Sequence, residues 1–174
     1  MAETTTSWNT TIILSTALKN HTISRMLMAQ QHRIRFSETV EKGALIFPLS
    51  GNAFLLVDLQ NHLEPSEESE LIKRIDIFSQ VHRNSFLLFY LPFSGKRGLQ
   101  ILSDIQCRFF HTKVRILPVR NNNEVLNGML TIAKATSKSH MDSICFRMSL
   151  AQAHIVESSG VWEFLKGTLS WASD

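Results

Sequence analysis

Hydrophobic positions along the chain follow two periods, one typical of strands and one typical of helices. Short apolar or alternating runs predict strands at residues 10–15, 33–37, 44–49, 53–58, 85–91 and 114–117. Stripes with helical spacing begin near Ile23, Pro65, Leu99 and Val125. Strands that alternate with helices of about a dozen residues indicate a parallel sheet covered by helices. The pattern therefore predicts an α/β fold with a mixed, mostly parallel sheet flanked by helices.

Local signals refine this assignment. Ser50-Gly51-Asn52 joins two predicted strands with the residues of a tight hairpin, so one strand pair should be antiparallel. Glu67, Glu68 and Glu70 place negative charge in the first turn of a helix, where the helix dipole favours it. Residues 92–98 are predicted to form a loop, and Pro118 is expected to close the last strand. The helix after the loop should bury Leu99, Leu102, Ile105 and Phe109.

After residues 136–139 the hydrophobic pattern has helical spacing only. This change predicts an α/β domain over 1–136 and a helical tail over 137–174. Asp142 can cap a first tail helix that is apolar on more than one side, and Ser158-Ser159-Gly160 breaks it before a second helix. A hairpin of this size has little core of its own, so it should dock either on the α/β domain or on another chain. Candidate residues for a partner interface are Ile144, Met148, Ile155, Trp162, Phe164 and Leu165.

Composition narrows the class of protein. An apolar fraction of 44% and a charged fraction of 19% are ordinary for a folded domain. The longest apolar runs are too short to span a bilayer, and no targeting segment is evident, so no membrane association is expected. Two cysteines form neither a disulfide framework nor a metal motif, so Cys107 and Cys145 are expected to be reduced and mostly buried.

Positive charge is concentrated in one stretch of the chain. Residues 83–120 hold seven basic side chains and one acidic side chain, although the whole chain has a net charge of only +3. This stretch surrounds one predicted helix and the strand that follows it. Such a basic face suits a nucleic-acid backbone, and the alternative is an ordinary solvated helix face. Candidate DNA-binding residues are Lys96, Arg97, Arg108, Lys113 and Arg115.

Motifs for catalysis are missing. The loop at Ser94–Gly98 lacks the first glycine and the Ser or Thr that a phosphate-binding P-loop requires, because Tyr90 and Arg97 occupy those positions. The seven histidines have no metal-site spacing. Asp58 ends a strand, but a single carboxylate cannot hold two metals. We therefore expect no enzyme activity, no metal, no cofactor and no small-molecule substrate.

Several stretches are similar to a known family. They are TTIILS at 10–15, LSGNAFLLVD at 49–58, NSFLL at 84–88, RILPV at 115–119, TIAKATSK at 131–138 and DSICFRM at 142–148. Together they cover most of the chain and resemble the vertebrate homologues of the meiotic sporulation protein sixteen. That family resembles the non-catalytic partner subunit of XPF-type nucleases, which implies an XPF-type core and a C-terminal helix-hairpin-helix element. Only 36 residues follow Lys138 in this sequence, so we expect that element to be truncated.

The resemblance also implies a function. It implies a meiotic crossover factor on chromosomes in the nucleus, which forms a heterodimer with the XPF-like shortage-in-chiasmata protein and binds branched DNA. The E-R-K-x-x-x-D motif of catalytic XPF-type subunits does not occur here, which agrees with a partner-subunit role. Two alternatives are a structural adaptor that makes no DNA contact and a small nucleotide-binding α/β protein.

Overall fold

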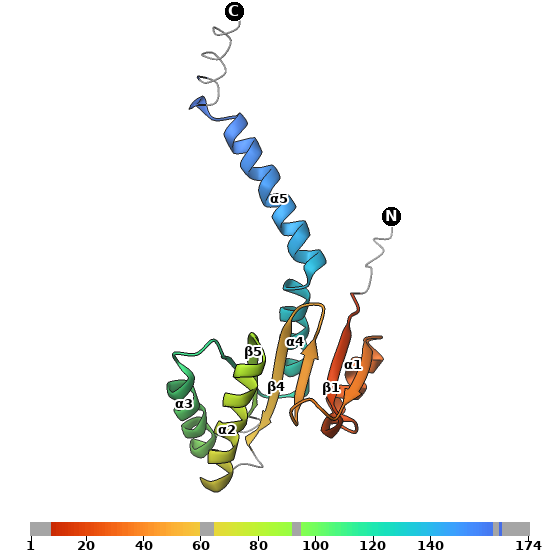
Figure 1. Ribbon diagram of the computed structural model, residues 1–174, viewed down its shortest axis with the longest axis vertical. Coiled ribbons are helices and arrows are strands. Elements are labelled where there is room, and N and C mark those ends of the chain that lie inside the picture. The colour runs from red at the N-terminus through yellow and green to blue at the C-terminus, as the bar shows by residue number, and fades with distance from the viewer. Residues whose placement is uncertain (1–7, 60–64, 92–94, 162–163, 165–174) are drawn as a thin grey trace, which may run out of the picture. The chain divides into compact units, whose positions relative to one another are not determined.

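A computed structural model describes residues 8–59, 65–91, 95–161 and 164. The chain divides into two compact units, Met1–Thr136 and Ser137–Asp174, and each is described by itself. The first unit holds the sheet and the helices that cover it, and the second contains one long helix (Figure 1).

A six-stranded sheet in the order β2-β1-β3-β4-β5-β6 forms the centre of the first unit. β1 pairs in parallel with β2, and β4, β5 and β6 are parallel to one another, whereas β3 is antiparallel to both of its neighbours. The mixed, mostly parallel sheet predicted from the hydrophobic pattern is thereby confirmed. The strands are β1 (Thr11–Ser15), β2 (Arg33–Ser37), β3 (Ala44–Phe47), β4 (Asn52–Asp58), β5 (Asn84–Tyr90) and β6 (Arg115–Val119).

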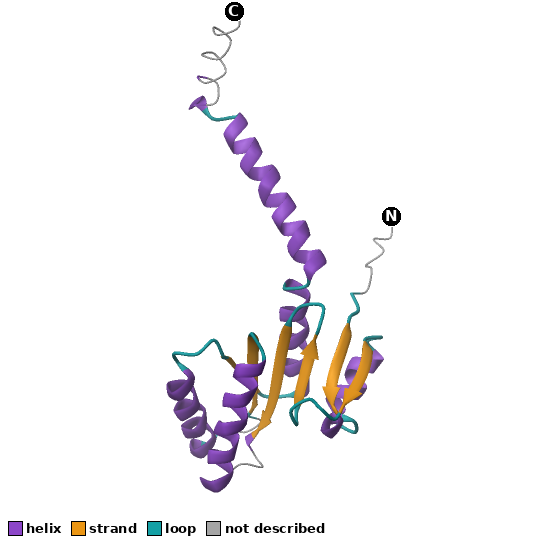
Figure 2. Cartoon of the chain, in the orientation of Figure 1, coloured by secondary structure: helices purple, strands orange, loops and turns teal. Residues whose placement is uncertain are grey.

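Helices cover both faces of this sheet, which gives three layers (Figure 2). On one face α1 (Thr22–Ala29) and α4 (Asn122–Ala135) pack over an apolar cluster that includes Phe54 and Phe86. On the other face α2 (Pro65–Val81) and α3 (Lys96–Phe109) pack over a cluster that includes Phe89. Because both faces are buried, β4 and β5 are nearly continuous apolar runs rather than alternating ones.

The start of α4 shows how local sequence fixes a helix. The Asn121 side chain accepts a hydrogen bond from the Glu124 backbone N–H at 2.9 Å. The Glu124 carboxylate in turn accepts from the Arg120 backbone N–H at 2.8 Å. This reciprocal arrangement satisfies two backbone donors that have no partner inside the helix.

Two predicted boundaries are wrong. The loop expected over 92–98 ends earlier, because α3 begins at Lys96 and its first turn contains Arg97 and Gly98. Lysine and arginine are good helix formers, and Gly98 lets the helix approach β5, since a Cβ there would lie 3.1 Å from Leu91 Cδ2. Pro118 lies inside β6 instead of closing it. β6 is an edge strand, where a missing N–H donor can face away from the sheet.

The apolar face of α3 is rotated from the predicted one. Leu102, Ile105 and Phe109 are buried as expected, but Leu99 is 51% exposed and Ile101 is buried in its place. Ile101 is buried because it packs in the apolar cluster with residues of β5 and α2. The predicted face of Leu99, Leu102, Ile105 and Phe109 did not include it.

The second unit contains α5 (Lys138–Glu157), which begins four residues before the predicted cap. Ser137 occupies the N-cap position, so the prediction of Asp142 as the cap is wrong. A turn at Ser158 and Ser159 ends α5, and residues 160, 161 and 164 are again helical. Trp162 and Leu165 lie outside the described residues.

Burial of histidines predicts a stability that depends on pH. The ring of His32 accepts a hydrogen bond at Nδ1 from the Thr10 backbone N–H at 3.3 Å, and burial lowers the pKa of His32. Burial also lowers the pKa of His82, and that of His21 despite the opposing effect of Asp58. The folded state therefore binds fewer protons than the unfolded state once the pH falls below the ordinary histidine pKa of about 6.5.

We expect the free energy of unfolding to be at its plateau above pH 7 and to fall as the pH drops from 6.5 towards 5. Urea unfolding at a series of pH values measures this slope. His32→Asn keeps an acceptor near Thr10 but does not titrate, so its slope should be shallower than that of the unmodified chain. A stability that rises on acidification in this range would contradict the prediction.

Candidate nucleic-acid and partner surfaces

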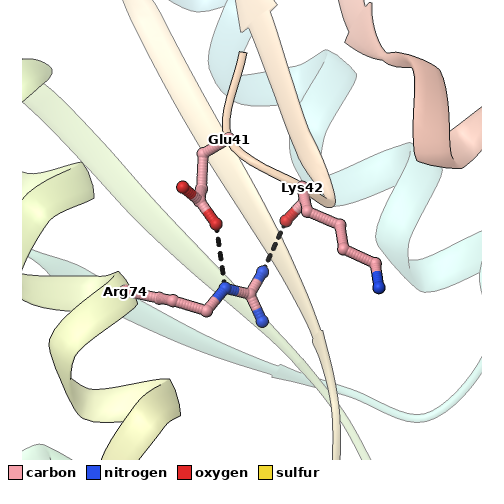
Figure 3. Close-up of polar contacts among 3 residues, drawn as sticks. All are labelled: Glu41, Lys42 and Arg74. Carbon is pink, nitrogen blue, oxygen red and sulfur yellow. Dashed lines mark hydrogen bonds and ion pairs between the residues drawn. The ribbon is translucent and has the colours of Figure 1, made fainter. Parts of the chain in front are cut away.

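The carboxyl ends of β1, β2, β4, β5 and β6 meet at one edge of the sheet, where α/β folds usually hold ligands. Here that edge is occupied by an ion pair. Arg74 of α2 donates from Nε to Glu41 Oε1 at 2.9 Å and from a terminal nitrogen to the Lys42 carbonyl at 2.6 Å (Figure 3). The guanidinium thus fastens α2 to the segment before β3. The charged groups of Arg74 and Glu41 are thus paired with each other.

A hollow of about 380 Å³ adjoins this ion pair. Asp58 at the end of β4 lies in its wall opposite His21, whose pKa is lowered by burial and raised by the carboxylate, with burial the larger effect. The neutral imidazole and the single carboxylate supply too few ligands for two-metal chemistry. Across the described residues no three His, Cys, Asp or Glu side chains gather into a group that could hold a metal ion.

Two of the predicted DNA-binding residues lie along the groove between α2 and α3. Arg97 forms an ion pair with Glu68 of α2, with 3.4 Å between the nitrogen and the carboxylate oxygen. Arg108, three turns further along α3, borders a shallow hollow together with Glu68 and Lys73. Half of the Arg97 side chain is exposed, so this ion pair is of the kind that contributes at most about 1 kcal/mol. Glu68 nevertheless offsets part of the positive charge in the groove.

The other three predicted residues lie elsewhere on the first unit. Lys96 starts α3 at the carboxyl edge of the sheet, whereas Lys113 and Arg115 lie at the opposite edge, where β6 begins. Arg115 stacks on Phe86, with 5.3 Å from its guanidinium carbon to the ring centroid, and Phe86 belongs to the cluster under α4. The five residues are all exposed, but the fold distributes them over two edges and one helix groove.

The predicted partner residues that the structure describes are exposed on the second unit. Met148, Ile155 and Phe164 are 57%, 67% and 70% exposed, and Ile144 is exposed as well. Helical spacing places Ile144, Met148 and Ile155 on one face of α5. Phe146 and Leu150 lie on a different face and are also more than half exposed. α5 therefore has two apolar faces, as the sequence indicated.

The structure also describes both cysteines and the apolar content of the helices. Cys107 on α3 and Cys145 on α5 are free, but both are exposed, so the expectation that they are mostly buried is wrong. Cys107 lies on a flank of α3 that faces away from the apolar cluster under that helix. Within the described ranges, no helix is long and apolar enough to cross a membrane.

The amino-acid sequence matches one protein family over most of its length. A family model described as "Protein SPO16 homolog" matches residues 6–168. The human protein of that name is 45% identical over 159 residues, which are 91% of this chain and 88% of the human protein. The match extends through both units.

Comparison with solved structures concerns the fold alone. XPF from Aeropyrum pernix superposes with a TM-score of 0.61 at 6% identity and covers 74% of this chain. The same archaeal protein in complex with DNA gives 0.55 at 7% identity and covers 72%. This chain spans 62% and 64% of those two archaeal chains, respectively. The XPF-type core expected from the sequence is confirmed.

Proposed function

The chain belongs to the Protein SPO16 homolog family, and on that premise we propose that it is a non-enzymatic subunit of a meiotic recombination complex. In this proposal it forms a heterodimer with an XPF-like partner, the shortage-in-chiasmata protein. The pair binds and stabilises branched recombination intermediates on chromosomes in the nucleus, and so promotes crossover formation in meiotic prophase. The observation that carries the proposal is the pair of exposed apolar faces on α5.

Two apolar faces on one helix favour a protein partner. Exposed apolar patches larger than a few hundred Å² are rare on monomeric proteins and mark interaction surfaces. Met148 and Ile155 on one face and Phe146 and Leu150 on the other are each more than half exposed. Separate faces need separate covering surfaces, and a second chain can supply them. Tail residues outside the described ranges, Trp162 and Leu165, belong to the same proposed interface.

The sparse acidic groups among the described residues of the carboxyl edge are consistent with a role without enzyme activity. At the carboxyl edge, Glu41 is held by Arg74, and Asp58 is the one carboxylate among the described residues that line the adjoining hollow. A subunit that only binds DNA needs basic side chains that contact phosphates and a surface that fits the shape of the DNA. The exposed Lys113 and Arg115 side chains offer such cations, which favours a DNA contact by this subunit over a purely structural adaptor.

Co-expression with the XPF-like partner tests the heterodimer. We expect a 1:1 complex by light scattering, and we expect the complex to bind a four-way junction more tightly than either subunit alone. Titrations at two salt concentrations should show a steep loss of affinity with salt, because released counterions contribute to binding. A chain that stays monomeric in the presence of the partner would overturn the proposal. Equal junction affinity and equal salt dependence for the partner alone and for the complex would favour the adaptor.

A further inference from the structure

The amino ends of β4, β5 and β6 lie at the edge of the sheet opposite the Arg74 ion pair. Three connections meet there: residues 48–51 before β4, residues 82–83 before β5 and residues 110–114 before β6. They are neighbours because β4, β5 and β6 are adjacent and parallel, with Asn52 opposite Asn84 and Phe86 opposite Arg115. In Figure 1 the connection after α3 lies at the upper left of the first unit.

Charge is distributed unequally between the two edges. The three connections at the amino edge, and the connection at 30–32 as well, contain no Asp or Glu. The carboxyl edge, in contrast, holds Glu38, Glu41 and Asp58. At the amino edge Arg83 and Lys113 are exposed, and within the described part of the chain neither forms an ion pair. Within the described residues, these connections therefore carry positive charge and no acidic side chain of their own.

Hydrogen bonds fix the backbone of these connections. Thr112 accepts from the Val114 backbone N–H at 3.3 Å and donates from its hydroxyl to the Phe109 carbonyl at 2.7 Å. The Ser85 hydroxyl donates to the His82 carbonyl at 2.6 Å, and the Asn84 side chain donates to the Gly51 carbonyl at 3.3 Å. A surface whose backbone is already fixed loses less conformational entropy when it binds.

An exposed aromatic side chain belongs to the connection before β6. Phe110 directly follows α3 and is 79% exposed, which makes it the most exposed of the large hydrophobic residues outside the masked ranges. Its ring meets the ring of His111 edge-on, with centroids 5.3 Å apart. Proteins hold unpaired bases and their phosphates with exposed aromatic rings and nearby cations, and the connection of Phe110 also contains Lys113. Arg115, seated on Phe86, completes the positive surroundings on the side of β6.

We infer that the amino-edge surface, defined as Arg83, Phe110, Lys113 and Arg115, is where this subunit contacts branched DNA. The inference rests on the proposed function and makes it specific. The three cations bind the phosphodiester backbone next to a branch point, and Phe110 stacks on a base that the branch leaves without a stacked neighbour. The α2–α3 groove with Arg97 and Arg108 is less suited, because Glu68 lies within it.

Neutralising pairs of cations in the full-length heterodimer locates the contact. Arg83→Gln with Lys113→Gln should weaken binding to a four-way junction about 10-fold or more at 0.1 M salt, and should reduce the salt slope by about 2. Two matched variants change the same number of charges elsewhere. Arg97→Gln with Arg108→Gln tests the helix groove, and Lys19→Gln with Arg120→Gln tests the carboxyl edge. Both are expected to leave the slope unchanged.

Phe110→Ala tests the base contact. It should weaken binding to a junction or to a duplex with a single-stranded flap about 5- to 100-fold, and should leave binding to a blunt duplex almost unchanged. Leu99→Ala is the control, because it removes an exposed apolar side chain from α3 itself. Thermal unfolding of each variant confirms that the fold is retained.

The outcomes separate this inference from the function on which it rests. If the unmodified heterodimer binds no branched DNA, the proposed function and the inference both fail. If it binds and only the Arg97 and Arg108 variant loses affinity, the function stands and the amino-edge surface is wrong. If Arg83→Gln with Lys113→Gln weakens binding but Phe110→Ala does not discriminate between junction and duplex, the backbone contact stands and the base contact is overturned.

Discussion

Placing glutamates on one apolar face of α5, with Met148→Glu and Ile155→Glu, is expected to raise the Kd of the heterodimer at least 100-fold. Both side chains are more than half exposed in the chain by itself. If the partner covers them, each change buries a charge where a large apolar anchor had packed. Anchors of that kind contribute about 2 kcal/mol or more each, and 1.4 kcal/mol corresponds to a tenfold change in Kd.

Co-purification and a binding titration measure this effect. Phe146→Glu with Leu150→Glu tests the second face in the same way. Ser149→Glu is the control, since helical spacing places it between the two faces. Glutamate is a good helix former, so α5 itself should persist in all three variants.

Two results would contradict the prediction. Unchanged partner binding in both double variants would exclude α5 from the interface. A lower thermal unfolding temperature of the chain by itself, with partner binding retained, would instead favour the alternative in which the tail docks on its own α/β unit.

Truncating Phe54 is expected to have the largest effect on the stability of the α/β unit. Phe54 on β4 is fully buried, and its ring lies 5.5 Å from that of Phe47 and 5.0 Å from that of Phe86. Phe54→Ala removes contacts with both rings and leaves a cavity in the apolar cluster between the sheet and the helices α1 and α4. Such changes cost about 3–5 kcal/mol, which is a large share of the stability of a typical domain.

Urea unfolding of the purified protein measures this cost. Ile77→Ala on α2 is the control, because its side chain is 57% exposed and the expected loss is below about 1 kcal/mol. Because Phe54 supports Phe86, and Phe86 carries Arg115, the variant should also loosen the amino-edge surface. A loss for Phe54→Ala no greater than that for Ile77→Ala would contradict the burial on which this prediction depends.

The sequence by itself determined the elements and their class. β4 and β5 are nearly continuous apolar runs because both faces of the sheet are covered by helices. Such runs can be recognised in the sequence alone. The sequence also predicted the acidic first turn of α2 and the two apolar faces of α5, because each feature depends on residues only a few positions apart. The family was also evident from short stretches spread along the chain.

Only the tertiary structure decided which charged residues are neighbours. Five cations between 96 and 115 are close along the chain, yet Lys96 and Lys113 lie at opposite edges of the sheet, because α3 crosses it from one edge to the other. Arg83, distant in sequence from Arg115, comes to the same edge because β5 and β6 are paired. Pairing of this kind depends on contacts between segments and leaves no local signal. For the same reason the sequence could not reveal that Glu68 faces Arg97, or that Ile101 rather than Leu99 is buried.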